Sequence, residues 1–439
     1  MSILTNLLGD DGCFENDVEI LGQIYGRFFV GAYSKILDKS EVYNALIGRF
    51  SVIESGCIIG YHENRYDCFS NHDFFCNFFN NSNIDYYQKL KKSSRTYYEC
   101  NKYTFIGNDV RIGCNSIIVE GVSIGDGAII YPNSYVDFDV PEYAIVRGNP
   151  ANIEKFRFDD ELIELFKYVN WCDYDIPVIV SKFLLHRKEK KNLKATIYMN
   201  WIDCADDFIR YLYCSKNELT KLNFTRYYYN RNLNKLNQCN ANKIIVGPSH
   251  IALWFRQYNC GKINKPVSAH LFPIDAVSLF SDTLDKLITW GRRYFGGGVV
   301  LFVPDFRIGN ISCNRSKKDG IFISPEKLSL DNDLKCYELG LDKLKKFSLL
   351  GSIYFWFWCL WGRENYNKLH NSYVTDGKYK HPIWNYDNLL RQYSGSVIDI
   401  NNYFDGSQID SLVEDHSIHP TKATYDKMID IFDNEDTYV

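Results

Sequence analysis

Residues 106–136 read IGNDVR IGCNSI IVEGVS IGDGAI IYPNSY V, and an aliphatic residue returns at every sixth position. These residues are Ile106, Ile112, Ile118, Ile124, Ile130 and Val136. A helix repeats every 3.6 residues and an alternating strand every two, so neither explains this period. A coil of three short flat strands does, because each aliphatic side chain then points inward and stacks on its counterpart one coil away. The stretch therefore predicts a parallel β-helix.

The same period begins earlier in the chain, although less regularly. Aliphatic residues stand at Ile24, Val30, Ile36 and Val42 and, after a slip of one position, at Ile47, Ile53 and Ile59. We expect residues 1–23 to form a short N-terminal cap. The period is lost between Ile59 and Ile106, where the segment 61–104 is rich in aromatic and polar residues. A long loop that leaves a rigid scaffold is usually functional, so this insertion is a candidate site.

A helix is predicted after the repeat, over 159–171. Its apolar residues share one face, and Asp159 precedes them as an N-cap. That face consists of Leu162, Ile163, Phe166 and Val169. We expect the helix to close the open end of the β-helix, where strand edges would otherwise be exposed.

Length and composition bound the class of protein. A chain of 439 residues favours two domains, and a net charge of −4 argues against a nucleic-acid partner, which needs a basic face. The 14 cysteines include no C-x-x-C pair, and the N-terminus lacks the pattern of a signal peptide, so we expect reduced thiols and a cytoplasmic protein. The uncharged segment 347–361 is shorter than the roughly 20 residues of a spanning helix. It is predicted to be a buried helix or a subunit contact, and attachment to a membrane surface is the alternative.

The six-residue period does not return after the charged run at 186–194. Strands are predicted at 243–247, 299–303 and 396–400, with helices between them, for example at 276–290 and 335–348. This alternation is typical of an α/β domain with a largely parallel sheet.

In chain order, the first half contains a set of six-residue repeats, a long loop with a histidine, and a second set of repeats. The segment DVPEYAIVRGNPA at 139–151 and an acidic helix follow. This arrangement resembles the xenobiotic-acetyltransferase branch of the hexapeptide-repeat acyltransferases over residues 24–180. That branch includes chloramphenicol and streptogramin acetyltransferases and O-acetyltransferases of capsule and O-antigen. The resemblance implies a left-handed parallel β-helix, a homotrimer, acetyl-CoA in the groove between neighbouring β-helices, and a catalytic histidine on the long loop.

By this resemblance His62 is the catalytic base, and His72 is the alternative. The family's loop often reads H-x-x-x-x-x-S-T-H-x-F-F, whereas the interval from His62 to Ser70 is two residues longer in this chain. A neutral imidazole takes the proton of an acceptor hydroxyl as that oxygen attacks the acetyl carbonyl, and its ordinary pKa of about 6.5 suits this role at pH 7.

The resemblance also indicates the residues that bind acetyl-CoA. The turn Gly148-Asn149-Pro150-Ala151 matches the segment beside the pantetheine arm, and glycine permits a close backbone approach. Arg111 replaces a tryptophan that is common in the family, so contacts there should differ. Arg147 and Lys155 are candidates for the phosphates of coenzyme A. No metal site is predicted.

The second half resembles the SGNH (GDSL-like) hydrolase superfamily in the order of its motifs. Ser249 follows the first strand, Asn310 follows the second, and His419 lies near the C-terminus. The resemblance implies a flavodoxin-like α/β sandwich with Ser249 as nucleophile, His419 as its base and Asn310 as an oxyanion donor. The superfamily has Asp-x-x-His, but Asp415 stands four residues before His419. Three possibilities therefore remain open. Asp415 reaches His419 by a shifted turn, the site is a Ser–His dyad without an acid, or the site is inactive.

We predict two domains: a left-handed β-helix acetyltransferase domain at 1–185, with its long loop at 61–104, and, after a linker at 186–195, an SGNH-like α/β domain at 196–439.

The predicted reaction is direct acetyl transfer from acetyl-CoA to a hydroxyl of a bacterial capsule or O-antigen glycan, or of its precursor, by a homotrimer. Peripheral association with membrane-bound polysaccharide-assembly machinery would suit that role. The alternatives are N-acetylation of a nucleotide-linked amino sugar, acetylation of an antibiotic, a bifunctional acetyltransferase and acetyl esterase using Ser249, and a trimeric scaffold with a lectin-like second domain.

Overall fold

The computed structural model contains two compact units, Met1–Gln238 and Cys239–Val439. The residues that it describes are 6–8, 11–62, 102–175, 178–183, 185, 205–219, 221–222, 224–230, 235–239, 242–247, 251, 254, 270–273, 282–296, 298–303, 342–357, 397–398, 403–405, 409–412 and 420–433.

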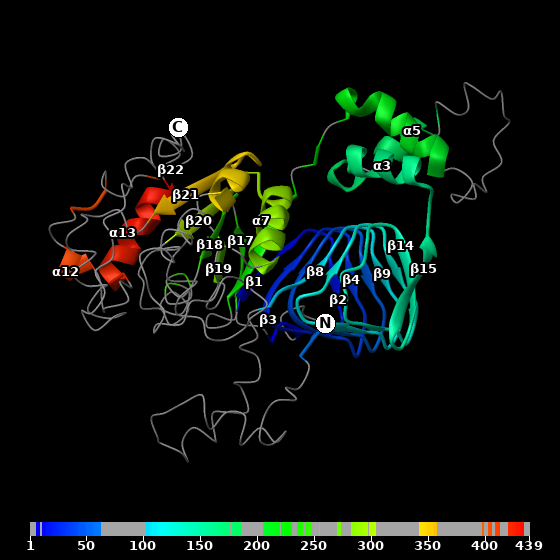
Figure 1. Ribbon diagram of the computed structural model, residues 1–439, viewed down its shortest axis with the longest axis horizontal. Helices are drawn as coiled ribbons and strands as arrows, with labels where there is room; N and C mark the ends of the chain where they lie inside the picture. The colour runs from blue at the N-terminus through cyan, green and yellow to red at the C-terminus, as the bar shows by residue number, and fades with distance from the viewer. Residues whose placement is uncertain are drawn as a thin grey trace, which may run out of the picture. The chain divides into compact units, whose positions relative to one another are not determined.

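The first unit is built on a parallel β-helix with three faces (Figure 1). Its strands are β1 (Asp11–Glu15), β2 (Glu19–Ile20), β3 (Gln23–Val30), β4 (Lys35–Ile36), β5 (Glu41–Ile47), β6 (Val52–Ile53), β7 (Ile58–Tyr61), β8 (Thr104–Ile106), β9 (Arg111–Ile112), β10 (Ile117–Val119), β11 (Ser123–Ile124), β12 (Ile129–Ile130), β13 (Tyr135–Val136), β14 (Ala144–Gly148) and β15 (Ala151–Phe156). Strand β5 bends across a corner, so that its first residues pair with β7 and its last residues pair with β8. The insertion between β7 and β8 therefore leaves the coil at that corner.

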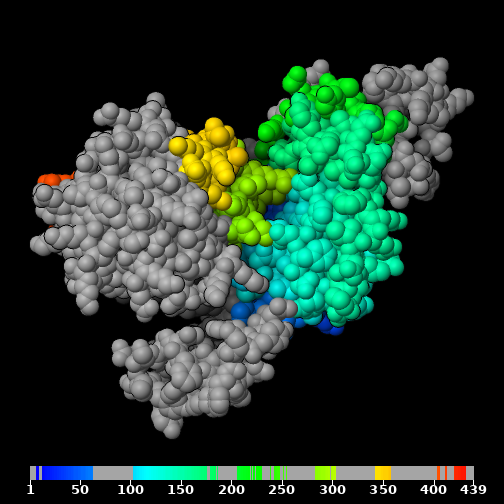
Figure 2. Space-filling model, viewed as in Figure 1, coloured from blue at the N-terminus to red at the C-terminus, as the bar shows by residue number. Residues whose placement is uncertain are grey.

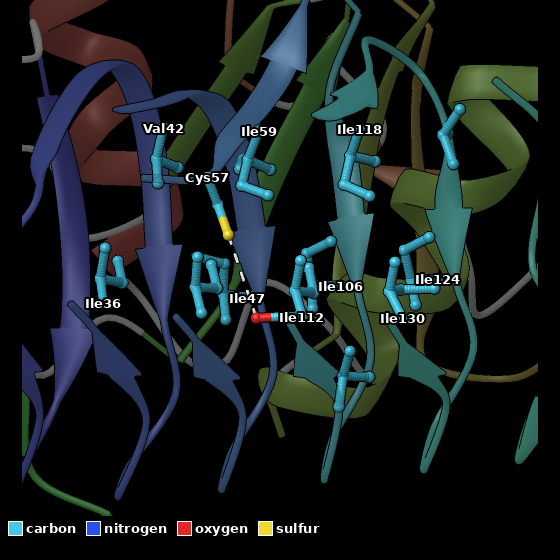
Figure 3. Packing of buried hydrophobic residues seen from close by; sticks show 14 of the residues in the cluster. Ile36, Val42, Ile47, Cys57, Ile59, Ile106, Ile112, Ile118, Ile124 and Ile130 are labelled. Atoms are coloured by element: carbon cyan, nitrogen blue, oxygen red, sulfur yellow. Dashed lines mark hydrogen bonds between the residues drawn. The ribbon is translucent and has the colours of Figure 1, made fainter. Parts of the chain in front are cut away.

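The aliphatic residues predicted from the six-residue period form the core. All six in the stretch 106–136 are at most 2% exposed. Figure 3 shows Val42, Ile59 and Ile118 in one row, and each is paired in register with the next coil. Each such buried side chain stabilises the fold by about 1.5–3 kcal/mol. The predicted repeat is therefore the hydrophobic core of the first unit.

Small polar side chains bond the coils together where the wall turns. Ser34 Oγ donates to the carbonyl of Gly48 at 2.7 Å, and the N–H of Ser51 donates to Ser34 Oγ at 2.9 Å. Cys57 occupies a similar place at another corner, where its Sγ donates to the carbonyl of Gly113 at 3.2 Å. Burial raises the pKa of the Cys57 thiol to about 11, so this group is structural rather than reactive.

The helix predicted after the repeat is α3 (Asp160–Val169). The Asp159 carboxylate accepts from the N–H of Leu162 at 2.9 Å, as expected of an N-cap, and the four predicted apolar residues are buried. These residues pack against Tyr143 and against the helix α5 (Ala205–Ser215), which η5 (Lys216–Glu218) follows. Both helices lie beside the coils, and Figure 2 shows them continuous with the β-helix surface.

The structure differs from the expectation that this helix closes the open end. Strand β15 runs antiparallel to β14 and covers the edge of the last coil instead. The segment around α3 follows a corner of the β-helix: Arg157 donates to Asp109 at 3.0 Å, and Trp171, in η3 (Trp171–Asp173), packs against Phe50 at 5.1 Å between ring centroids. Backbone pairing with β15 is enough to cover the edge of the last coil. The apolar face of α3 is therefore not needed there and packs beside the corner of the β-helix.

The N-terminal segment is part of the β-helix rather than a separate cap. Strand β1 pairs in parallel with β3 on one side and antiparallel with β16 (Arg226–Asn230) on the other, and β17 (Lys235–Cys239) extends this sheet. Phe14 and Tyr227 stack across this pairing with ring centroids 5.7 Å apart. The segment 205–239, which the sequence assigns to the second domain, thus lies almost entirely in the first compact unit.

A buried ion cluster joins distant parts of the first unit. Arg49 Nε and Nη2 donate to the two carboxylate oxygens of Glu15 at 2.6 and 2.8 Å, and its Nη1 donates to Asp173 at 2.5 Å. The side chains of Glu15 and Arg49 are 0% and 5% exposed. The cluster links β1, the corner before β6 and the turn that follows α3.

The second unit contains a five-stranded parallel sheet. Its strands are β18 (Ile244–Gly247), β19 (His270–Pro273), β20 (Val299–Val303), β21 (Ile353–Phe357) and β22 (Val397–Ile398). The helices among its described residues include α7 (Asp282–Tyr294), α12 (Ile409–Leu412), α13 (Lys422–Asp433) and residues 342–348. The spatial order β19-β18-β20-β21-β22 is the 2-1-3-4-5 order of flavodoxin-like folds. All three predicted strands are confirmed. The helix predicted at 276–290 overlaps α7, and the described part of the helix predicted at 335–348 is helical over 342–348.

The described part of the uncharged segment at 347–361 contains a strand rather than a continuous helix, and it is only partly buried, because Leu349 and Leu350 are 86% and 41% exposed. Gly351 and Ser352 adopt positive φ values of 69° and 52°, which end the preceding helical turn. Strand β21 follows, and its Phe355 and Trp356 are 0% exposed in the middle of the sheet. Among the described residues, no helix has the length and apolar character needed to cross a membrane.

Replacing Arg49 by Met should destabilise the first unit by about 3–5 kcal/mol, because it leaves the Glu15 carboxylate buried without its bidentate partner. Lys35→Met is the matched control: its ion pair with Glu19 is 52% and 45% exposed, and we expect a loss of about 0–1 kcal/mol. Thermal unfolding of the full chain followed by circular dichroism compares the two variants. Equal midpoints for Arg49→Met and wild type would contradict a stabilising role for the cluster.

Candidate active site

His62 is the first residue after β7, at the corner where the long insertion leaves the coil. One coil further on, Glu120 is the first residue after β10, which pairs in parallel with β7. The backbone N–H of Glu120 donates to the carbonyl of Tyr61 at 2.9 Å. The register of these two strands therefore places the side chains of His62 and Glu120 next to each other.

The His62 ring and the Glu120 carboxylate form a close polar pair. Nδ1 of His62 lies 2.9 Å from Oε1 of Glu120, and the side chains are 40% and 11% exposed. A carboxylate only accepts, so the bond assigns the ring proton to Nδ1. The other nitrogen, Nε2, then carries a lone pair and can take a proton from a bound hydroxyl. This is the arrangement of a general base held by an acidic partner.

Glu120 is not among the site residues predicted from the sequence. Coil position alone would place Glu120, two residues past the stacked Ile118, opposite Tyr61, which stands two residues past Ile59. A register shift between Ile118 and Val119 pairs Val119 with Tyr61 and so brings Glu120 opposite His62. The insertion between the two coils hides this equivalence, since 57 residues separate His62 and Glu120 in the chain.

Lys102 is the third charged residue of this corner. Its Nζ lies 3.8 Å from Oε1 of Glu120, and its side chain is 59% exposed. The stem of Lys102 passes over Gly121, where an added Cβ would lie 3.4 Å from Cδ of the lysine. The φ of +79° at Gly121 also favours glycine, so this close approach is built into the turn.

The cations predicted to bind coenzyme A belong to a different sheet. Arg111, in β9, donates from Nη2 to Glu54 Oε1 at 2.5 Å, and its side chain is 61% exposed. Arg147, in β14, lies over the ring of Tyr131 at 4.1 Å and 3.3 Å from Glu154. Both guanidinium groups thus have an acidic neighbour, and both remain accessible from the surface.

The predicted turn 148–151 connects β14 and β15. Gly148 and Ala151 pair across the hairpin, and Asn149 and Pro150 form its tip, with a cis peptide bond between them. The φ of +107° at Gly148 requires glycine, and its N–H donates to Ser134 Oγ at 3.3 Å. Lys155 lies on β15 opposite Ile145, with an exposed side chain. The turn and the cations therefore share one sheet, whereas His62 follows a strand of the other.

Five predicted site residues lie outside the described part of the chain: His72, Ser249, Asn310, Asp415 and His419. The segments that carry Ser249, Asn310 and His419 each adjoin a described element. Gly247 ends β18, Val303 ends β20, and Pro420 precedes α13. In a parallel α/β sheet, the connections from strand to helix leave from the carboxyl edge. Trp254 stacks on Tyr425 of α13 with ring centroids 5.2 Å apart.

Comparison with known proteins agrees with the β-helix fold of the first unit. Residues 103–137 match the family model described as bacterial transferase hexapeptide (six repeats). A chloramphenicol acetyltransferase of Klebsiella aerogenes is 36% identical over 148 residues, which are 32% of this chain and 65% of that protein. A chloramphenicol acetyltransferase of Escherichia coli is 32% identical over 167 residues, which are 36% of this chain and 73% of that protein. The chain thus spans about two thirds of the length of these relatives.

Among solved structures, the polySia-specific acetyltransferase NeuO is similar to this chain at 24% sequence identity. The match covers 33% of this chain and 60% of that protein, with a TM-score of 0.23. A score this low adds no weight to a functional assignment.

Proposed function

The chain belongs to the hexapeptide-repeat acetyltransferase family, and we propose that it transfers the acetyl group of acetyl-CoA to a hydroxyl of a bacterial surface polysaccharide or its precursor. The observation that carries this proposal is the 2.9 Å pair of His62 and Glu120 beside the long insertion. The relatives above match only 32% and 36% of this chain, so most of it has no counterpart in those antibiotic acetyltransferases. This difference favours a larger acceptor than an antibiotic.

In the proposed mechanism, His62 acts as general base. Its Nδ1–H donates to Glu120, and its Nε2 takes the proton of the acceptor hydroxyl as that oxygen bonds to the acetyl carbon. When the C–S bond of the thioester breaks, Nε2 returns the proton to the sulfur, and His62 is neutral again. Glu120 holds the ring in the correct tautomer and stabilises the imidazolium during the step.

We propose that the turn 148–151, Arg111, Arg147 and Lys155 bind coenzyme A. Exposed ion pairs such as Arg147–Glu154 contribute only about 0–1 kcal/mol, so phosphate oxygens can replace the carboxylate at little cost. These residues and His62 lie on different sheets of one chain. We therefore propose that the complete site forms between neighbouring chains of a homotrimer, with His62 from one chain and the coenzyme A residues from the next.

Replacing His62 by Ala should lower acetyl transfer by about 10²–10⁴-fold, the usual contribution of a general base. Glu120→Gln should lower kcat by roughly 10- to 100-fold, because an amide can present its NH₂ instead of an acceptor to Nδ1. The measurement is free thiol release from acetyl-CoA in the presence of a panel of capsular oligosaccharides.

The matched control is Glu142→Gln, which removes a carboxylate that lies 3.3 Å from Lys167, beside α3. We expect it to leave turnover within a factor of two of wild type. Near wild-type turnover in His62→Ala would show that the assigned base is wrong. Alkaline treatment of the product tests the acceptor atom: an ester on oxygen is released, and an amide on nitrogen persists.

A second candidate function concerns the second unit. Its sheet has the flavodoxin-like order, and β18 and β20 flank the point where the chain reverses direction across the sheet. The segments that carry Ser249 and Asn310 begin at the carboxyl ends of these two strands. This topology favours an SGNH-type acyl-ester site there, with Ser249 as nucleophile and His419 as base, which would make the enzyme bifunctional.

Ser249→Ala should abolish hydrolysis of p-nitrophenyl acetate by the purified full chain, since no other hydroxyl would take its place as nucleophile. Ser348→Ala, which removes a hydroxyl that donates to the carbonyl of Lys345 in the same unit, is the control and should retain hydrolysis. Hydrolysis that is absent in wild type, or unchanged in Ser249→Ala, would contradict an esterase site in this unit. The β-helix site is tested separately by His62→Ala.

A further inference from the structure

The backbone of Lys102 leads into buried residues, whereas its side chain is 59% exposed. The residues that follow it, Tyr103 and Thr104, are 3% and 0% exposed as the chain enters β8. The aliphatic stem lies over Gly121, which has no side chain to displace it. The ammonium group is therefore held beside Glu120 while most of the side chain stays in water.

The ion pair between Lys102 and Glu120 contributes too little to the stability of the fold to explain why the lysine lies there. The N···O distance of 3.8 Å exceeds hydrogen-bond length, and the lysine is 59% exposed. The same carboxylate oxygen lies closer, at 2.9 Å, to Nδ1 of His62. An exposed ion pair of this kind contributes about 0–1 kcal/mol, so the ammonium can move to another anion at little cost.

Two charged side chains of the neighbouring strands β3 and β5 have shorter contacts. Arg27 Nη1 donates to the hydroxyl of Tyr103 at 3.1 Å, and Glu41 accepts from the hydroxyl of Tyr43 at 2.5 Å. The contact of the Lys102 ammonium group is longer than that of the Arg27 guanidinium group, and the lysine is more exposed to solvent.

We propose that Lys102 determines acceptor specificity by binding the carboxylate of an acidic sugar while a hydroxyl of that acceptor lies at Nε2 of His62. This inference rests on the proposed function of the His62–Glu120 site. A flexible four-carbon stem with three N–H donors suits a carboxylate attached near the reacting hydroxyl of a sugar ring. The phosphates of coenzyme A are the other source of anionic oxygen, and the experiment separates the two.

The test uses pairs of oligosaccharide acceptors, each a uronic-acid oligosaccharide and the same oligosaccharide with its carboxylates reduced to alcohols. For wild type, Lys102→Gln and Lys102→Arg, kcat and KM are measured for each acceptor and for acetyl-CoA. The matched control is Lys35→Gln, a lysine of similar exposure on another face of the β-helix.

We expect wild type to prefer the acidic member of a pair, and Lys102→Gln to reduce this preference in kcat/KM at least tenfold through KM of the acidic acceptor. Lys102→Arg should restore most of the preference, and Lys35→Gln should leave it unchanged. An unchanged preference in Lys102→Gln would overturn the proposal, as would an effect confined to KM of acetyl-CoA, which would assign the lysine to a phosphate. Absence of transfer by wild type to every acceptor would instead contradict the proposed function itself.

Discussion

The constraint on which the first unit depends is the register between successive coils. Each coil must place an aliphatic side chain directly on the one before it, as Val42, Ile59 and Ile118 do. The interior has no room for a slipped coil, because a shift by one residue would turn these side chains outward and bring polar ones in. The same register also fixes everything attached to the outside of the coil. His62 and Glu120 meet because the strands before them are paired, and no loop contact is needed to bring them together.

This dependence explains how a precise pair can stand next to a long insertion. Strands β5 and β8 pair directly across the corner, and β7 pairs with β10, so the scaffold closes on itself as if the insertion were absent. The two proposed catalytic side chains are then carried by the scaffold and not by the loop. Sites built on regular elements hold their geometry more closely than sites built on loops. The positions of His62 and Glu120 therefore depend on the paired strands of the scaffold.

Local patterns in the sequence predicted much of this structure, and long-range pairings account for most of what they missed. The six-residue period, the Asp159 cap and the apolar face of α3 each depend on neighbours within one coil or one helix turn. The partnership of β1 with β16 depends on residues far apart in the chain, and nothing near either strand indicates it. Strand β21 was missed because its aromatic run, continuous with the preceding apolar residues, carries no alternation. Glu120 was missed for the same reason as β16, since its partner lies beyond the insertion. Of the residues predicted to do chemistry, His62 is the one whose described surroundings contain a partner suited to proton transfer.

The pairing of β1 with β16 has a consequence for synthesis on the ribosome. The partner of strand β1 follows it in the chain by about 200 residues, as the pair Asp11 and Asn230 indicates. At roughly 5–20 residues per second, that interval lasts about 10 to 40 s. During this time one edge of the growing β-helix presents unpaired backbone groups, which readily pair with a strand of another chain. Until β16 and β17 have been synthesised, this edge can therefore pair with a strand of a neighbouring nascent chain on the same polysome.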